Sequence, residues 1–491
     1  MNEKAQDNQY RSMAKGIAML GGVQVFNIII SILRGKLVAL FLGPQGMGVM
    51  SLLQSSSQMV QQVSSVGLNL SAVKEVAGSS DNKQRTIAVV RKLLIVTSLV
   101  GVFIMIVFSR NLSQLSFGNS NYSIHYIFLS LWLLFITLAN GELSLLQGAQ
   151  ATKRLAFSSV VGSLVGLFVG VPLYYYFGEE GIVPALIISS FSLYVFYKIQ
   201  SLRQFGRISF LSVRLSKEWI LVKNLLSLGI IFMLSVLLGT IKNFMINYYV
   251  RTIGSLEDIG LFQAANTLTN QCAGIVFAAM AMDYFPRLSA VSSNNEEVRK
   301  LVNNQMEIVI LIVTPIVAML ILFAPLIIRI LLTNEFYSII PVIRIMSIGL
   351  FLKAVTYPMG YISFSKGDKK TFFWLEAVFA NIVQLVVSVI MYRMWGVIGL
   401  GTASAAVFLL FVFIYLFITK RLYSYTPNKA VLSLIVPLFV AVCLAFACSY
   451  MDNVYTSYII MTLTTFLLSV FCVIHLNKRL DIKSIILRRL K

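Results

Sequence analysis

The stretch from Ile435 to Ser449, I-V-P-L-F-V-A-V-C-L-A-F-A-C-S, contains no charged residue. With its flanks it reaches the roughly 20 apolar residues that a helix needs to cross a bilayer. Similar stretches recur along the chain, which is 58% hydrophobic and only 12% charged, whereas soluble domains are about a quarter charged. The sequence therefore predicts an all-α integral membrane protein.

Hydropathy divides the chain into about fourteen transmembrane helices. The predicted spans are 17–42, 45–73, 92–109, 123–147, 155–177, 182–200, 224–250, 259–283, 305–332, 338–363, 372–395, 398–419, 431–449 and 456–476. Because their number is even, both termini lie on the same side of the membrane.

The basic residues fix the predicted orientation. The net charge of +21 could indicate nucleic acid, but most of the 40 lysines and arginines lie in short loops on the side of the termini. That asymmetry follows the positive-inside rule, which places both termini in the cytoplasm. The charge therefore predicts membrane lipids as partners and no nucleic acid.

Signatures of an enzyme are missing from the sequence. The four cysteines lie inside apolar stretches without metal-ligand spacing. No nucleophile has a neighbouring histidine, and no Gly-rich phosphate loop of the Walker type is present. We therefore predict no metal, no cofactor and no catalytic residue.

An internal repeat organises the chain. Gly48, Gln54 and Gln58 match Gly260, Asn266 and Asn270 at an offset of 212, and later pairs match at offsets up to 218, among them Gly181 with Gly399. A repeat of six spans predicts two parallel six-helix lobes that form a V-shaped central cavity. The predicted domains are the N-lobe at 1–200, a cytoplasmic linker at 201–223, the C-lobe at 224–419, and spans 13–14 with a basic cytoplasmic tail at 420–491.

Polar side chains form stripes on the first two helices of each lobe. Their spacing of three or four residues places the members of a stripe on one helix face. One interpretation is interhelical hydrogen bonding, since amides join membrane helices. For four stripes in matching positions we favour a hydrated cavity, made cationic by Arg34 and Lys242, that binds an anionic ligand rich in hydroxyl groups. The other stripe residues are Asn27, Ser31, Gln54, Gln58, Gln61, Asn243, Asn266 and Asn270.

Three further cations inside spans are weaker candidates for substrate binding. Lys36 lies near the outer end of span 1, where snorkelling to the interface also explains it. Arg344 and Lys353 both lie in span 10. The acids in or near spans, Glu142, Asp283, Glu307 and Glu376, lie close to cytoplasmic ends, which favours pairing with loop cations over ion coupling.

The segment at 40–78, L-F-L-G-P-Q-G-M-G-V-M-S-L-L-Q-S-S-S-Q-M-V-Q-Q-V-S-S-V-G-L-N-L-S-A-V-K-E-V-A-G, combines a tight turn with a glutamine-rich span. It resembles the first hairpin of the Wzx-type O-antigen and polysaccharide translocases. These are flippases for lipid-linked oligosaccharides in the multidrug/oligosaccharidyl-lipid/polysaccharide exporter superfamily. The rest of the chain is similar to that family in span count and repeat layout.

The resemblance implies a flippase in the bacterial inner membrane. It would move an undecaprenyl-diphosphate-linked oligosaccharide, an O-antigen or other surface-polysaccharide repeat unit, from the cytoplasmic to the periplasmic leaflet by alternating access. Arg34 and Lys242 would meet the diphosphate or acidic sugars, and the stripe amides would meet the glycan. A polymerase and other polysaccharide-assembly proteins are candidate partners.

Three alternatives remain open from the sequence. A lipid II flippase is one alternative, because only the sequence of the first hairpin distinguishes it from a surface-polysaccharide flippase. A multidrug exporter of the same superfamily would be expected to carry deep acidic residues for cationic drugs. A membrane glycan polymerase or ligase would need a sizeable extracytoplasmic loop, which the short predicted loops do not provide.

Overall fold

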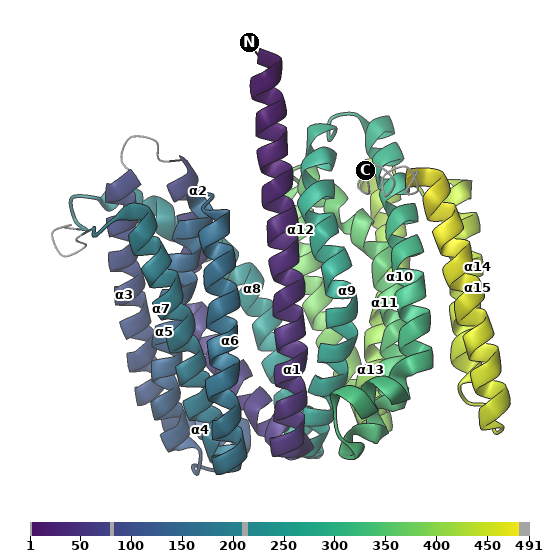
Figure 1. Ribbon diagram of the computed structural model, residues 1–491, viewed down its shortest axis with the longest axis horizontal. Coiled ribbons are helices and arrows are strands. Elements are labelled where there is room, and N and C mark those ends of the chain that lie inside the picture. The colour runs from purple at the N-terminus through teal and green to yellow at the C-terminus, as the bar shows by residue number, and fades with distance from the viewer. Residues whose placement is uncertain (1, 79–82, 209–214, 481–491) are drawn as a thin grey trace. The chain divides into compact units, whose positions relative to one another are not determined.

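The computed structural model describes residues 2–78, 83–208 and 215–480. Regular secondary structure in these ranges is helical throughout, without a strand (Figure 1). The chain divides into two compact units, Met1–Gly260 and Leu261–Lys491.

The first unit is built from long helices and one short 3₁₀ turn. Its elements are α1 (Asn2–Ser65), α2 (Leu68–Gly78), α3 (Lys83–Val107), α4 (Ser109–Phe117), α5 (Ser123–Gly148), α6 (Thr152–Phe177), η1 (Gly178–Gly181), α7 (Ile182–Phe205) and α8 (Trp219–Ile253). The second unit contains most of α9 (Leu256–Ala290), followed by α10 (Asn295–Leu331), η2 (Asn334–Ile339), α11 (Ile340–Ser365), α12 (Lys369–Phe372), the π-helical η3 (Phe373–Phe379), α13 (Ala380–Tyr423), α14 (Lys429–Cys448) and α15 (Val454–Leu480).

The helices account for the predicted spans. Among the described residues, 10 helical segments are long and apolar enough to cross a membrane. Three of them each hold two predicted spans, because Gly43 divides α1, η1 separates α6 from α7, and Trp395 and Gly396 leave helical geometry inside α13. With α9 as the remaining span, this confirms a multi-pass all-α membrane fold of about fourteen spans.

The second predicted span is interrupted. A continuous helix over 45–73 was expected, but α1 ends at Ser65 and α2 begins at Leu68. Between them Gly67 has φ 63°, and a Cβ there would lie 2.1 Å from the Gly229 carbonyl oxygen of α8. The break is therefore a close crossing of two backbones, which glycine permits at both positions.

The boundary between the compact units differs from the repeat-based boundary. The first unit ends at Gly260, so it includes α8. The sequence-based division instead starts the C-lobe at residue 224, with α8 as its first span. The two six-helix lobes stay a prediction.

Two turns at matching repeat positions have the same backbone geometry. Gly178, between α6 and α7, has φ 54° and ψ −130°, and Gly396, within α13, has φ 57° and ψ −138°. Three residues later, a Cβ on Gly181 would lie 2.2 Å from the Leu173 carbonyl oxygen. A Cβ on Gly399 would lie 1.9 Å from the carbonyl oxygen of Met391, again eight residues earlier. The likeness supports the predicted repeat.

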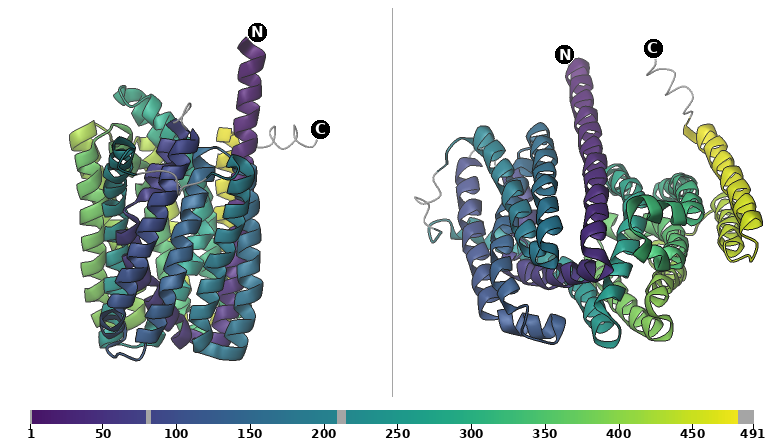
Figure 2. Two further views of the ribbon diagram at one scale, coloured as in Figure 1. Left: turned by 90° about the vertical axis from the view of Figure 1, so that its left-hand side faces the viewer. Right: turned by 60° about the horizontal axis from the view of Figure 1, so that its bottom comes forward.

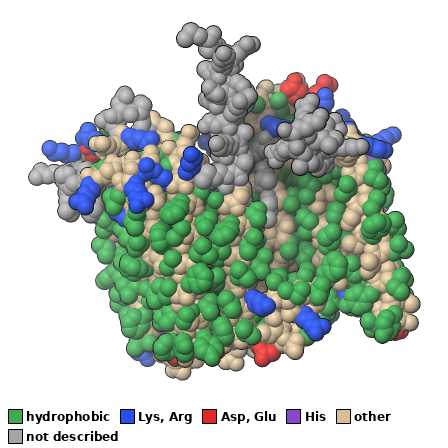
Figure 3. Space-filling model, in the orientation of Figure 1, with side chains coloured by type: hydrophobic (Ala, Val, Ile, Leu, Met, Phe, Trp, Pro, Cys, Tyr) green, Lys and Arg blue, Asp and Glu red, His purple; other side chains and the backbone are tan. Residues whose placement is uncertain are grey.

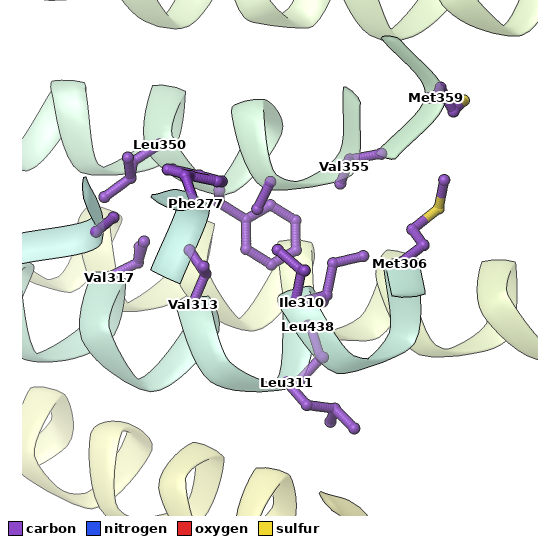
Figure 4. Packing of buried hydrophobic residues seen from close by; sticks show 14 of the residues in the cluster. Phe277, Met306, Ile310, Leu311, Val313, Val317, Leu350, Val355, Met359 and Leu438 are labelled. Atoms are coloured by element: carbon purple, nitrogen blue, oxygen red, sulfur yellow. The ribbon is translucent and has the colours of Figure 1, made fainter. Parts of the chain in front are cut away.

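The side chains suit a lipid environment outside and a packed core inside. Over the helices of the first unit, Figure 3 shows hydrophobic side chains along the flank and a group of lysine and arginine side chains toward one end. In the second unit, Phe277, Met306, Ile310 and Leu350 pack in a buried cluster contributed by α9, α10 and α11 (Figure 4). The hairpin of α14 and α15 packs on α10 (Figure 2).

Candidate functional site

The members of the polar stripe on the first helix have different surroundings: one forms hydrogen bonds to another helix, and one is a cation with an unpartnered nitrogen. Asn27 donates from Nδ2 to Ser159 Oγ at 2.8 Å and accepts at Oδ1 from Ser163 Oγ at 3.3 Å, so it joins α1 to α6. Ser31 and Arg34 are half-buried. The Arg34 Nη2 atom is inaccessible to solvent and has no hydrogen-bond partner among the described residues. A buried guanidinium nitrogen without a partner is costly, which makes Arg34 a candidate for ligand binding on this helix.

Lys36 lies two residues further along α1 and differs from Arg34 in burial. Its side chain is exposed on the first unit. An exposed lysine near a helix end is explained by snorkelling, without a ligand.

The glutamines of the second span face different surroundings. Gln61 is buried, Gln54 is half-buried and Gln58 is exposed on the first unit. Gln58 is therefore accessible to a ligand, whereas Gln61 lies in the packed interior. The members of the predicted stripe thus differ in exposure from one helical turn to the next.

Helix α8 carries the second candidate cation. Lys242 is half-buried and Asn243 is exposed on the first unit. The neighbouring Asn247 is buried and donates from Nδ2 to Ser51 Oγ at 3.2 Å and to Ser55 Oγ at 3.3 Å. Asn247 thus joins α8 to α1, whereas the exposed Asn243 and the half-buried Lys242 stay candidates for contact with a ligand.

In the second unit, the amides of α9 bond to each other. Asn270 Nδ2 donates to Asn266 Oδ1 at 2.7 Å, and the Asn270 side chain is exposed. The pair forms an exposed polar patch on one helix face, as the spacing of four residues predicted.

A missing backbone hydrogen-bond donor in α10 explains why an arginine, Arg344 of α11, lies inside the second unit. Pro325 in α10 has no N–H group to donate to the carbonyl of Ile321, four residues earlier. Arg344 Nε donates to this carbonyl oxygen at 3.1 Å, and its Nη1 donates to the Ser449 carbonyl at 3.4 Å. The guanidinium therefore satisfies backbone acceptors inside the second unit, and the structure accounts for it without a substrate.

Aromatic rings surround Lys353, the other cation of α11. Its Nζ lies 5.1 Å from the ring centre of Phe277 and 5.8 Å from that of Phe408. Such cation–π contacts stabilise a desolvated ammonium by about 2 kcal/mol. Lys353, like Arg344, has a structural partner within its own unit.

The predicted pairing of Glu142 with cations is part of a larger buried ion network in the first unit, whose members the sequence did not identify. Arg91 of α3 forms two hydrogen bonds with the Glu142 carboxylate of α5, at 3.0 and 3.1 Å, and the two side chains are 3% and 4% exposed. Lys198 of α7 lies 2.6 Å from the same carboxylate, and Ser201 accepts from Arg91 at 2.9 Å. The Glu142 carboxylate thus joins three helices, so these buried charges stabilise the packing of the unit and need no ligand to explain them.

The other intramembrane acids divide into two kinds. Glu307 pairs with Arg479 at 3.0 Å, so Glu142 and Glu307 both confirm the predicted pairing with cations. Glu376 does not, because it accepts a hydrogen bond from the Tyr415 hydroxyl and no described lysine or arginine forms an ion pair with it. It lies in η3, the π-helical turn that leads into α13. The side chain of Asp283 lies outside the described residues.

The candidate residues of the first unit differ in what they offer a ligand. Arg34 has a buried nitrogen without a described partner, Gln58 and Asn243 are exposed, and Lys242 is half-buried. Asn27, Arg344 and Lys353 have protein partners that hydropathy could not reveal, because each partner lies on another helix.

Two protein families and a curated flippase resemble this chain in sequence. Residues 37–341 match the family described as polysaccharide biosynthesis protein, and residues 255–471 match the family of the lipid II flippase MurJ. The lipid III flippase of Escherichia coli (strain K12) is 21% identical over 404 residues, which cover 80% of this chain and 94% of that protein.

Solved structures share the fold. A lipid II flippase MurJ in an inward closed conformation aligns with a TM-score of 0.68 at 15% identity, covering 95% of this chain and all of that one. An inward-facing multidrug resistance MATE family transporter of the MOP superfamily aligns with a TM-score of 0.69 at 18% identity, covering 81% and 94% of the two chains. These relatives are flippases and transporters. Because the first family match spans more than half of the sequence, the chain belongs to the polysaccharide biosynthesis protein family.

Proposed function

We propose that the protein is a flippase for an undecaprenyl-diphosphate-linked oligosaccharide, an O-antigen or other surface-polysaccharide repeat unit. It moves this substrate from the cytoplasmic to the periplasmic leaflet of a bacterial inner membrane by alternating access, with both termini in the cytoplasm. The observation that carries the proposal is the polysaccharide biosynthesis family match over residues 37–341. The relationship to a lipid III flippase across 80% of the chain supports it.

The chemistry of the first unit fits an anionic, hydroxyl-rich substrate. Arg34 holds a buried guanidinium nitrogen without a described partner, and diphosphate oxygens are suitable acceptors for it. Lys242 adds a second cation, and the exposed amides of Gln58 and Asn243 suit glycan hydroxyls. An inside-negative potential favours outward movement of an anion by about 2.3 kcal/mol per charge per 100 mV, so the membrane potential assists translocation.

Reconstituted translocation tests this proposal. Proteoliposomes containing the full chain receive a fluorescent undecaprenyl-diphosphate oligosaccharide, and its arrival in the opposite leaflet is followed by chemical quenching. We expect Arg34→Ala and Lys242→Ala to slow translocation by about tenfold or more, the factor that the loss of one charge-assisted hydrogen bond of 1.5–3 kcal/mol produces.

The matched control is Arg110→Ala. Arg110 is an exposed cation of α4 in the same unit and has no place in the proposed site. It should translocate at the wild-type rate. Unchanged rates in both Arg34→Ala and Lys242→Ala would remove these residues from the site, and a wild-type protein that moves no lipid-linked glycan would refute the function.

A lipid II flippase is the second candidate, because residues 255–471 match the MurJ family. The two candidates differ in the intermediate that accumulates when the protein is depleted. Accumulation of lipid-linked polysaccharide units in growing cells supports the first, whereas accumulation of lipid II with cell lysis supports the second.

A further inference from the structure

A small cavity lies within the first unit, where three connecting segments meet. Its volume is about 220 Å³. The start of the second span, the connection between α4 and α5, and η1 each contribute to its wall. In the predicted topology the second span begins on the outer side of the membrane, and the other two segments are outer connections. In the proposed orientation the cavity therefore lies on the side where the glycan leaves the membrane. Its lining consists of Val49, Leu53, Asn121, Tyr122, His125, Glu179 and Glu180.

The G-P-Q-G-M-G turn at 43–48 helps to build this cavity. Gly43 leaves the helix with φ 61°, which turns the chain into the second span. A Cβ on Gly46 would lie 3.6 Å from the Glu179 side chain, so the turn packs directly against η1. Val49 and Leu53 follow on the next helical turn and are each 1% exposed. The motif thus supplies a rigid apolar wall beside two carboxylates.

The polar side of the cavity is held in place by its own contacts. Tyr122 stacks on Phe117 with 3.9 Å between ring centres, which fixes the position of its ring. Burial, and then the charges of Glu179 and Glu180, raise the pKa of the Tyr122 hydroxyl, so it stays protonated as a hydrogen-bond donor. His125 Nε2 lies 3.3 Å from Glu180 Oε2, which orients this carboxylate although its side chain is 79% exposed.

The lining selects one class of ligand. Two carboxylates repel an anion, and a wall of mostly polar side chains does not suit an apolar molecule. No group of three His, Cys, Asp or Glu side chains among the described residues could hold a metal ion. Carboxylate, amide, imidazole and phenol groups instead match the donors and acceptors of hydroxyl groups. Val49 and Leu53 suit the C–H face of a sugar ring.

We infer that this cavity is a subsite for one neutral or amino sugar of the glycan, an inference that rests on the proposed flippase function. Its volume equals that of about seven waters at ~30 Å³ each, so it holds a single sugar residue rather than a drug-sized ligand of ~300–1,000 Å³. The diphosphate is bound by the cations of the spans, and the sugar is bound at the outer end. The two sites of the first unit thereby recognise opposite ends of one substrate.

Saturation-transfer NMR on the full chain in nanodiscs tests the subsite. The probes are free galactose, N-acetylglucosamine, glucosamine and glucuronic acid. We expect magnetisation transfer to the neutral and amino sugars. Transfer to glucuronic acid should be weaker by about fivefold, the factor for one like-charge pair near 4 Å in water. Glu179→Gln and Glu180→Gln should reduce this discrimination, and Asn121→Phe should abolish transfer by filling the cavity.

Glu335→Gln is the matched control, since Glu335 is an exposed acid of η2 in the other unit. It should retain the wild-type pattern. Absence of transfer to every probe, or transfer that Asn121→Phe leaves unchanged, would overturn the subsite. Failure of the flippase proposal is distinguishable: the wild type would then fail to translocate lipid-linked glycan in proteoliposomes, whatever the result with free sugars.

Discussion

Gly48 and Gly260, which match each other in the internal repeat, pack against each other's helical turns. A Cβ on Gly48 would lie 1.9 Å from the Leu256 carbonyl oxygen, and a Cβ on Gly260 would lie 1.8 Å from that of Pro44. Pro44 and Leu256 each precede their own repeat glycine by four residues. Each glycine therefore contacts the carbonyl that lies four residues before the other one. Neither position has room for a side chain.

Alanine at either glycine should destabilise the protein. A methyl group would overlap a backbone carbonyl that cannot rotate away, and overpacking of this kind costs about 1–3 kcal/mol. Thermal melting of the purified protein in detergent should show a lower melting temperature for Gly48→Ala and for Gly260→Ala. Gly35→Ala is the control, because nothing lies within 4 Å of a Cβ at that position of α1. Equal melting temperatures for the three variants would contradict the close crossing.

The two paired intramembrane acids should differ in their effect on stability. Glu142→Gln leaves Arg91, which is 3% exposed, without a counter-charge, and breaking a buried pair costs about 3–5 kcal/mol. Glu307 is itself only 8% exposed, but Glu307→Gln leaves behind Arg479, which is 58% exposed, so no buried charge remains and the loss should be about 0–1 kcal/mol. Melting in detergent should therefore show a large decrease for the first variant and a small one for the second. A similar decrease for both would show that burial of Arg91 is not what matters.

A double-mutant cycle tests the role of Arg344. Arg344→Met alone leaves the Ile321 carbonyl without a donor, and we expect a loss of about 1.5–3 kcal/mol. Pro325→Ala restores a backbone N–H four residues after Ile321, so Arg344→Met should cost less in that background. The measurement is the free energy of unfolding of the four proteins. Strictly additive effects would mean that Arg344 does not replace the donor that proline removes.

Asp368 should make stability depend on pH in the acid range. It is the N-cap of α12 and accepts from the Thr371 backbone N–H at 3.0 Å, the main reason that its pKa lies below the ordinary 3.8. A lowered pKa in the folded state adds stability that is present above pH 3.8 and is lost as the pH falls through the folded-state value.

Asp368→Asn is the variant that isolates this charge, because asparagine also caps helices well. The wild type should melt at a higher temperature than the variant at neutral pH, and the difference should shrink below the ordinary pKa of 3.8. A difference that stays constant with pH would show that the Asp368 charge does not contribute.

Much of the fold could be predicted from periodic features of the sequence. The apolar runs predicted the spans, because a bilayer requires about 20 apolar residues in each. The repeat predicted that Gly181 and Gly399 occupy equivalent places, and their turns have the same geometry. The break at Gly67 was not predictable, because it depends on Gly229, which is far away in the sequence.

The candidate site was harder to predict for the same reason. Burying a charged side chain in a membrane span costs free energy. The sequence shows which spans carry a cation, but not which group on another helix stabilises it. Arg344 meets a carbonyl freed by Pro325, and Lys353 meets two rings, whereas Arg34 keeps a nitrogen without a described partner. The outer cavity left no periodic signal, since Asn121, Tyr122, Glu179 and Glu180 lie in short connections and His125 lies in the first turn of α5.

The two equivalent turns carry different chemistry on one backbone. In the first copy, Gly178 and Gly181 enclose Glu179 and Glu180, and in the second, Gly396 and Gly399 enclose Val397 and Ile398. The backbone has the same shape at both turns, while the two side chains between the glycines are acidic in one and apolar in the other. The glycines therefore fix the form of the turn, and the residues between them set its polarity independently of that form.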